Sequence, residues 1–298
     1  MAPRTLRAGA LELVIDAERG GSIMRLRDED FDLMRAWDGV TDSPLAYACF
    51  PLVPFSGLVD HARFTFAGRC HELEPDPAHR PHAIHGDGWT SPWRLVAAGA
   101  DRAVIELVRD RPGSAFRYRA EQRFALLAGR LEVGLSVTNR AEAPMPFGLG
   151  LHPWFDRRPG TLLSAEVGGV WQPDADNLPR RREPVPVPWG FRLRRPVAEL
   201  ALDHEFEGWS GTARIDWPDA GRALEIEASG LFRHLVVYVP PAASFFCIEP
   251  VSHVADGFNL MAAGFPDTGV RILAPGETMS GLIRFVPLRK SWNPLLIG

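Results

Sequence analysis

Short segments in which apolar and polar residues alternate recur along almost the whole chain. Each segment is strand-sized and is bounded by Gly, Pro, Asp or Asn, which is typical of half-buried β-strands. Such segments are residues 11–15, 22–26, 63–66, 103–108, 116–124, 131–138, 223–228, 235–239, 245–248 and 281–286. No segment has a long helical period, and strand and helix patterns do not alternate, which argues against a doubly wound sheet or a TIM barrel. We therefore predict an all-β fold, a large antiparallel β-sandwich with one continuous core.

The length of 298 residues allows two ordinary domains or one large β domain. Residues 172–190 are rich in Pro, Asp and Arg and would be the linker between two domains. Because the strand patterns on both sides are alike, we predict a single domain over residues 1–298. Residues 172–190 are then a long surface loop at the rim of a site. Residues 180–182, three consecutive arginines, are more typical of a solvated face than of a binding patch.

The charge and cysteine content restrict the partners and the compartment. A formal net charge of −4 gives no basic surface for nucleic acid. Cys49, Cys70 and Cys247 are scattered, so we expect free buried thiols of a reduced compartment rather than disulfides or a zinc site. No apolar run approaches the length of a membrane span, and the N-terminus has no apolar targeting region. We expect a cytoplasmic protein, a monomer or homodimer, without a membrane partner.

The stretch Gly148-Leu149-Gly150-Leu151-His152-Pro153-Trp154-Phe155 places one histidine at the end of an alternating segment, beside aromatic residues. The unperturbed pKa of histidine lies near neutrality, so His152 suits proton transfer. The structural alternative is a core histidine that is hydrogen-bonded to a neighbouring carbonyl, with Trp154 packed beside it.

The stretch Pro81-His82-Ala83-Ile84-His85-Gly86-Asp87-Gly88-Trp89 combines two histidines with a glycine-rich turn and a tryptophan. Metal binding is one interpretation, but an i, i+3 histidine pair on a strand or loop faces no common point, and no third ligand follows. A sugar site fits better, because tryptophan faces stack on the apolar face of a pyranose while imidazole bonds its hydroxyl groups.

Two acidic residues complete the candidate set. Asp203 lies in residues 202–209, which we interpret as an acidic loop, and it can accept hydrogen bonds from vicinal hydroxyls or cap a turn. Glu249 ends the strongly apolar segment 242–248, where desolvation would raise its pKa toward the range of a general base. Residues 256–259 are predicted to form a structural turn.

Taken in order, these pieces resemble the aldose 1-epimerase (mutarotase) family over nearly the whole chain. The resemblance rests on Ile84-His85-Gly86 with Gly88-Trp89 and Trp93, Gly150-Leu151-His152-Pro153-Trp154-Phe155, Leu202-Asp203 with Phe206, Ile248-Glu249-Pro250, and Leu273-Ala274-Pro275-Gly276-Glu277. The order and spacing of these motifs are more specific than any one of them.

The resemblance implies a galactose mutarotase-like super-sandwich and interconversion of the α and β anomers of a small aldose, without a metal or organic cofactor. It would make Glu249 the general base at the anomeric hydroxyl and His152 the general acid at the ring oxygen. His85 would bond the sugar near the reacting centre, and Asp203 would anchor hydroxyls farther round the ring. This acid and base assignment agrees with the pair picked out from the residues alone.

One departure from the family pattern concerns substrate choice. Many relatives carry Asn-Arg where this chain has Gly57-Leu58, with that arginine reaching the sugar. Arg63 is the nearest arginine in sequence that could replace it. Three alternatives therefore stay open: a sugar-binding protein that has lost catalysis, an epimerase of phosphorylated hexoses that uses residues 180–182, and a glycosidase with Asp203 and Glu249 as its carboxylates.

Overall fold

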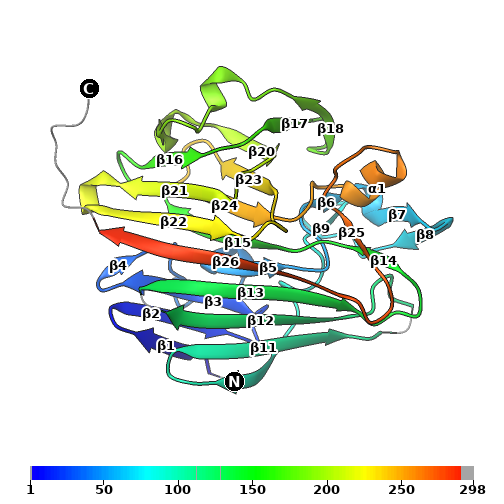
Figure 1. Cartoon of the computed structure of the whole chain (residues 1–298), viewed down its shortest axis with the longest axis horizontal. Helices are drawn as coiled ribbons and strands as arrows, with labels where there is room; N and C mark the ends of the chain where they lie inside the picture. Colours follow the sequence, from blue (N-terminus) through cyan, green and yellow to red (C-terminus); the bar gives the residue numbers. More distant parts are fainter. Residues whose placement is uncertain (1, 112, 128, 290–298) are drawn as a thin grey trace.

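Two large antiparallel sheets contain most of the strands and pack against each other (Figure 1). The computed structural model describes residues 2–111, 113–127 and 129–289. One apolar cluster includes buried side chains of both sheets, for example Leu13 and Leu26 from one and Val133 and Phe285 from the other. The predicted all-β sandwich with a continuous core is therefore confirmed.

The first sheet has 11 strands. In order across the sheet they are β1 (Arg4–Ala8), β2 (Leu11–Asp16), β3 (Ser22–Asp28), β5 (Cys49–Leu52), β15 (Gly150–Asp156), β24 (Phe245–Val251), β23 (His234–Val239), β20 (Leu202–Glu207), β17 (Gly169–Pro173) and β18 (Pro179–Glu183), with β4 (Phe31–Asp32) beside β3. The strands β15, β24, β23 and β20 occupy the middle of this sheet, and β15, β24 and β20 carry the candidate residues His152, Trp154, Glu249 and Asp203.

The second sheet has nine strands. In order they are β10 (Arg94–Ala98), β11 (Arg102–Arg109), β12 (Tyr118–Leu127), β13 (Arg130–Asn139), β26 (Thr278–Arg289), β22 (Arg222–Ala228), β21 (Thr212–Trp217), β16 (Leu162–Ala165) and β19 (Arg195–Pro196). Along β13 every second residue is buried, so one face of this sheet covers the core.

Short elements fill the remainder of the described chain. The two-stranded pairs are β14 (Met145–Phe147) with β25 (Arg271–Leu273), β6 (Leu58–Val59) with β9 (Ala83–Ile84), and β7 (Arg63–Phe66) with β8 (Arg69–Glu72). The helices are α1 (Gly257–Ala262) and the 3-10 turns Pro44–Ala46, Asp60–Ala62, Val187–Trp189, Val197–Glu199 and Pro218–Ala220. Among the described residues, no helix has the length and apolar character of a membrane span.

All ten predicted segments overlap strands, but the structure corrects four other expectations. Residues 172–190 are not one loop, because β17 and β18 form a hairpin at the sheet edge, where prolines are tolerated. Residues 202–209 contain β20 rather than a loop, and residues 256–259 begin α1 rather than forming a simple turn. Cys49 and Cys247 are free and buried as expected, whereas Cys70 is free but exposed.

Candidate active site

One row of side chains crosses the middle of the first sheet and forms the floor of a pocket. The strand register and the pleat place these side chains on one face, since residues that oppose each other on neighbouring strands point the same way. The opposed pairs are Phe50 with His152, Glu249 with Val236, Val236 with Glu205, and Glu205 with Trp171. Strands β15 and β24 are neighbours, so His152 and Glu249 meet within this row.

The pocket above this row has a volume of about 270 Å³, which suits a small ligand. Six of the seven residues predicted from sequence line it: His85, Trp89, His152, Trp154, Asp203 and Glu249. Arg63 does not line it, and this prediction is wrong. Arg63 is exposed at the start of β7, where its backbone carbonyl accepts a hydrogen bond from Asn259 Nδ2 at 3.0 Å.

Glu249 and His152 form the chemical centre of the pocket. His152 Nε2 lies 3.3 Å from Glu249 Oε1, and both side chains are buried. Burial raises the pKa of Glu249 well above its usual value, with the nearby carboxyl groups of Asp203 and Glu205 adding to the effect. Burial lowers the pKa of His152 well below its usual value. Both shifts therefore favour a pair with one proton that lies on the Glu249 carboxyl group, beside a neutral His152.

The structure does not show the alternative in which His152 is a core histidine hydrogen-bonded to a neighbouring carbonyl. Its Nδ1 is buried and has no hydrogen-bond partner in the part of the chain that the structure describes. The ring is instead fixed by aromatic neighbours, with ring centroids 4.5 Å from Phe50 and 4.9 Å from Trp154, and it is nearly parallel to Trp154. A buried histidine without a carbonyl partner, but in contact with a glutamate, is an arrangement expected of a functional site.

His85 is oriented by a reciprocal contact with Gly57. The Gly57 N–H donates to His85 Nδ1 at 3.0 Å, and the His85 N–H donates to the Gly57 carbonyl at 2.9 Å. Because Nδ1 is an acceptor, the neutral ring carries its proton on Nε2 and can donate it to a ligand. Burial lowers the pKa of His85 to about 3, so the ring stays neutral at neutral pH. The His85 ring stands perpendicular to that of His152, with centroids 5.3 Å apart.

Position 57 requires glycine. Its φ is +69°, and a Cβ there would lie 2.4 Å from the Ala255 Cβ. Gly57 thus allows a tight loop at the point where this chain departs from the family pattern. This loop orients His85 and approaches Glu205.

Asp203 lies near the mouth of the pocket and is held by the β17–β18 hairpin. Asn177, at the tip of this hairpin, donates from Nδ2 to Asp203 Oδ2 at 2.9 Å. Desolvation raises the pKa of Asp203, and the Asn177 hydrogen bond acts against this rise. Asn177 itself lines the pocket, as do Pro173 and Pro179 from the same hairpin, so part of residues 172–190 borders this pocket.

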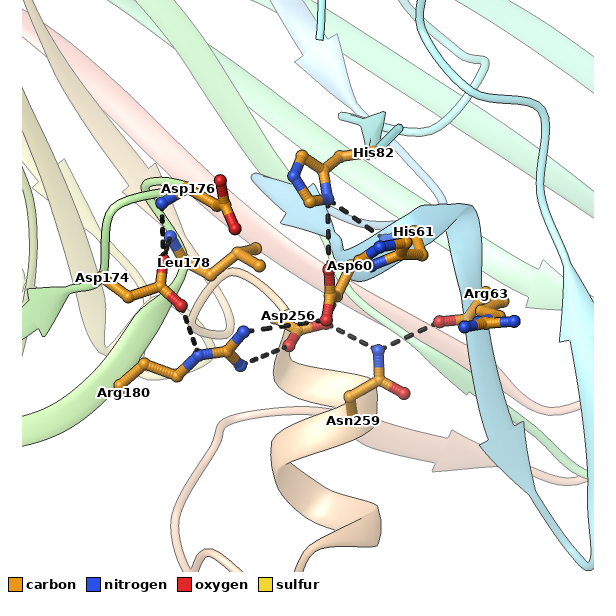
Figure 2. Close-up of polar contacts among 10 residues, drawn as sticks. All are labelled: Asp60, His61, Arg63, His82, Asp174, Asp176, Leu178, Arg180, Asp256 and Asn259. Atoms are coloured by element: carbon orange, nitrogen blue, oxygen red, sulfur yellow. Dashed lines mark hydrogen bonds and ion pairs between the residues drawn. The ribbon is translucent and has the colours of Figure 1, made fainter. Parts of the chain in front are cut away.

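Arg180 joins the β17–β18 hairpin to Asp60 and Asp256, which belong to distant segments of the chain (Figure 2). Its guanidinium contacts Asp174 at 2.7 Å, Asp256 at 3.4 Å and Asp60 at 3.7 Å. Asp174 in turn accepts the N–H groups of Asp176 and Leu178, which shapes the hairpin tip. Figure 2 shows Arg63 at the margin of this network, joined to it only through its backbone.

Two groups of described residues bring potential metal ligands together: Asp60, His61 and His82, and His152, Cys247 and Glu249. In the first group, His82 Nδ1 accepts the His61 N–H at 3.1 Å and Arg180 approaches Asp60, so the ligand atoms already have partners. In the second group, burial raises the pKa of Cys247 well above its usual value, which disfavours the thiolate that metals prefer. His82 and His85 do not share either group.

Sequence reasoning missed Glu205. This carboxyl group lines the pocket from β20, and its Oε2 accepts the Ala255 N–H at 2.7 Å. Burial raises its pKa to about 8. The alternating position two residues after Asp203 was the available signal, but it has meaning only when residues 202–207 are known to be a strand.

The fold and the site together define a class of β-sandwich with a paired glutamate and histidine on the floor of a small pocket. The aldose 1-epimerase family model matches residues 5–285. The chain belongs to the aldose 1-epimerase family.

Individual relatives are similar to this chain over almost its whole length. The uncharacterized protein YphB of Escherichia coli K12 is 34% identical over 300 residues, covering 97% of this chain and 98% of that protein. A crystal structure from Escherichia coli K12 superposes with a TM-score of 0.88 at 30% identity, over 97% of this chain and 99% of the other. A galactose mutarotase-like protein of Clostridium acetobutylicum shares the fold, with a TM-score of 0.84 at 19% identity over 96% and 95% of the two chains.

Proposed function

We propose that this protein is an aldose 1-epimerase that interconverts the α and β anomers of a small sugar. The observation that carries the proposal is the buried contact between Glu249 and His152 at the floor of a small pocket. Ring opening of a pyranose needs one group to remove the proton of the anomeric hydroxyl and another to protonate the ring oxygen. A pair that holds one proton between two sites meets both needs.

In the reactive form of the pair, the proton of Glu249 has passed to His152 Nε2 across their 3.3 Å contact. Glu249, now the carboxylate, removes the proton from the anomeric hydroxyl. His152, as the imidazolium, donates its Nε2 proton to the ring oxygen as the bond from that oxygen to C1 breaks. The aldehyde then rotates about its C1–C2 bond, and reclosure with the two roles reversed gives the other anomer. The proton count balances, because the pair loses one proton to the ring oxygen and gains one from the anomeric hydroxyl.

The other lining residues bind and orient the sugar in this proposal. His85 donates from Nε2 to a sugar oxygen near the reacting centre, and Asp203 accepts hydrogen bonds from hydroxyl groups farther round the ring. Trp89 and Trp154 line the pocket and offer apolar surface to the C–H face of a pyranose.

The arginines of residues 180–182 do not support an epimerase of phosphorylated sugars. Arg180 contacts three carboxylates, Arg181 lies 3.0 Å from Glu183, and Arg182 lies 3.0 Å from Glu207. None of these arginines belongs to the described lining of the pocket. We therefore propose a substrate that carries no anionic group.

The proposal is tested by polarimetry of freshly dissolved α anomers of glucose, galactose and arabinose, with glucose 6-phosphate as the anionic comparison. We expect the protein to speed the approach to anomeric equilibrium for at least one uncharged sugar and not for the phosphate. An optical rotation that relaxes at the spontaneous rate for every sugar would contradict the proposal. If sugars bound without faster relaxation, the protein would be a sugar-binding member of the family.

A further inference from the structure

The lining of the pocket combines carboxyl groups from β20 and β24 with four histidines. Three carboxyl groups, those of Asp203, Glu205 and Glu249, line it, and no lysine or arginine is present among its described lining residues. The proposed reaction assigns no role to the carboxyl group of Glu205.

Glu205 faces the reacting pair across the width of the pocket. In the strand register it opposes Val236, which itself opposes Glu249. Neighbouring strands lie about 4.8 Å apart, so the backbones of Glu205 and Glu249 are separated by about 10 Å. A sugar ring over Val236 would have Glu249 and His152 on one side and Glu205 on the other.

One oxygen of Glu205 is fixed and the other is available. Oε2 accepts the Ala255 N–H at 2.7 Å, which is the single hydrogen bond of this side chain within the described residues. Oε1 lies 3.2 Å from the place that a Cβ on residue 57 would occupy, so a side chain at position 57 would crowd this oxygen and glycine does not. Desolvation favours the neutral form of this carboxyl group, and a ligand that carries a positive charge would favour its ionised form.

We propose that the preferred substrate of this site is an aldose that carries a protonated amino group, with Glu205 as the ion-pair partner of that group. The proposal rests on the proposed epimerase function and names the class of its substrate. Glu205 is then a specificity-determining residue: its carboxylate, formed when the ligand binds, pairs with the ammonium group. A phosphate or carboxylate substituent would find no lysine or arginine among the described lining residues.

Burial gives the proposal a second, independent signature. Because the pKa of Glu205 is raised to about 8, the empty pocket holds this carboxyl group largely protonated at pH 6.5. An ammonium group favours the ionised form, so Glu205 releases its proton to the buffer when an amino sugar binds. An uncharged sugar leaves the proton in place.

The test compares anomer exchange by proton NMR for glucose, 2-amino-2-deoxyglucose, 3-amino-3-deoxyglucose, 6-amino-6-deoxyglucose and N-acetylglucosamine at pH 6.5. We expect kcat/KM for at least one amino sugar to exceed that for glucose by tenfold or more, with no such gain for N-acetylglucosamine. Glu205→Gln keeps the shape of the side chain and an acceptor for the Ala255 N–H. This variant should reduce the preference to threefold or less.

Glu207→Gln is the matched control, because Glu207 lies two residues along the same strand, pairs with Arg182 and does not line the pocket. This variant should keep the full preference for the amino sugar. Calorimetric titration in buffers of different ionisation enthalpy should show proton release with the amino sugar in the parent and not in Glu205→Gln.

The outcomes separate this inference from the proposed function. Exchange of glucose at least as fast as that of every amino sugar would overturn the inference and leave the epimerase proposal intact. Binding of amino sugars without faster exchange, abolished by Glu205→Gln, would support the charge assignment and overturn the epimerase proposal. A preference unchanged in Glu205→Gln would also overturn the role of Glu205.

Discussion

Burial is the main cause of the pKa shifts of Glu249 and His152. Exposed glutamate and histidine have pKa values near 4.5 and 6.5, so such a pair holds a single proton only between those values. In this fold the pKa of Glu249 is raised and that of His152 is lowered. The folded pair therefore favours a proton on Glu249, and catalysis needs this proton to pass to His152.

The pH profile of kcat/KM should show both shifts. Below the lowered pKa of His152 the pair gains a second proton and the base is lost. Above the raised pKa of Glu249 the pair loses its only proton and the acid is lost. After subtraction of spontaneous mutarotation, we expect an acid limb at lower pH than the pKa of an exposed histidine and an alkaline limb at higher pH than the pKa of an exposed glutamate. An acid limb at the histidine value or above it, or an alkaline limb at the glutamate value or below it, would contradict the burial argument.

Replacing His152 by asparagine should remove the acid and leave the fold. General acid catalysis typically contributes about 10²–10⁴ in rate, so we expect His152→Asn to lower kcat by at least about a hundredfold. His71→Asn, which changes a histidine outside the pocket, should retain the parental rate. Thermal unfolding of both variants by circular dichroism checks the fold, and near-parental turnover in a folded His152→Asn variant would refute its assignment as the acid.

At the scale of elements, the β17–β18 hairpin holds the side of the pocket on which Asp203 lies. Arg180 ties this hairpin to Asp256 and Asp60, and Asn177 at its tip bonds Asp203. Positioning of Asp203 therefore depends on an ion-pair network outside the pocket lining.

Arg180→Gln should loosen this hairpin and raise KM for the sugar by about fivefold, the effect of about one hydrogen bond, with a smaller change in kcat. Arg181→Gln is the matched control, since Arg181 is exposed and contacts Glu183 within the same strand. Hydrogen exchange at the amides of residues 174–178 should be faster in Arg180→Gln only. Equal KM values and equal exchange in the two variants would exclude a positioning role for Arg180.

The strands that the sequence predicted are those whose two faces meet different environments. Alternation marked β11, β13 and β26 because one face lies on the core and the other is polar. It failed for β20, where Leu202 and Phe206 face the core but Asp203 and Glu205 face a polar pocket, so the strand has the composition of a loop. When a strand lines a polar pocket, both of its faces can carry residues that break the alternation of apolar and exposed polar positions, and the strand is then missed.

Single site residues, too, could be predicted from the sequence only where their neighbours along the chain indicate their environment. His152 and Glu249 were predictable because each is a titratable group within an apolar segment. Glu205 was not, since its environment comes from Gly57 and Ala255, which are distant in sequence. Arg63 was misplaced because closeness to Gly57 along the chain is not closeness in space.

For the whole molecule, the shared core of the two sheets implies that they unfold together. Buried side chains from both sheets belong to one cluster, so neither sheet retains its apolar partner if the other opens. We expect a single calorimetric transition whose van't Hoff and calorimetric enthalpies agree. Two resolved transitions would contradict the prediction of one domain over residues 1–298.

The central claim is that the Glu249–His152 pair opens and recloses an aldose ring. The most direct measurement is magnetisation transfer between the α and β anomeric protons of an equilibrated sugar, in the parent and in Glu249→Gln. We predict transfer faster than the spontaneous rate in the parent, reduced by at least about a hundredfold in Glu249→Gln, which retains the shape of the side chain but lacks a base. Equal transfer rates in the two proteins, or none above the spontaneous rate in the parent for any sugar, would contradict the account.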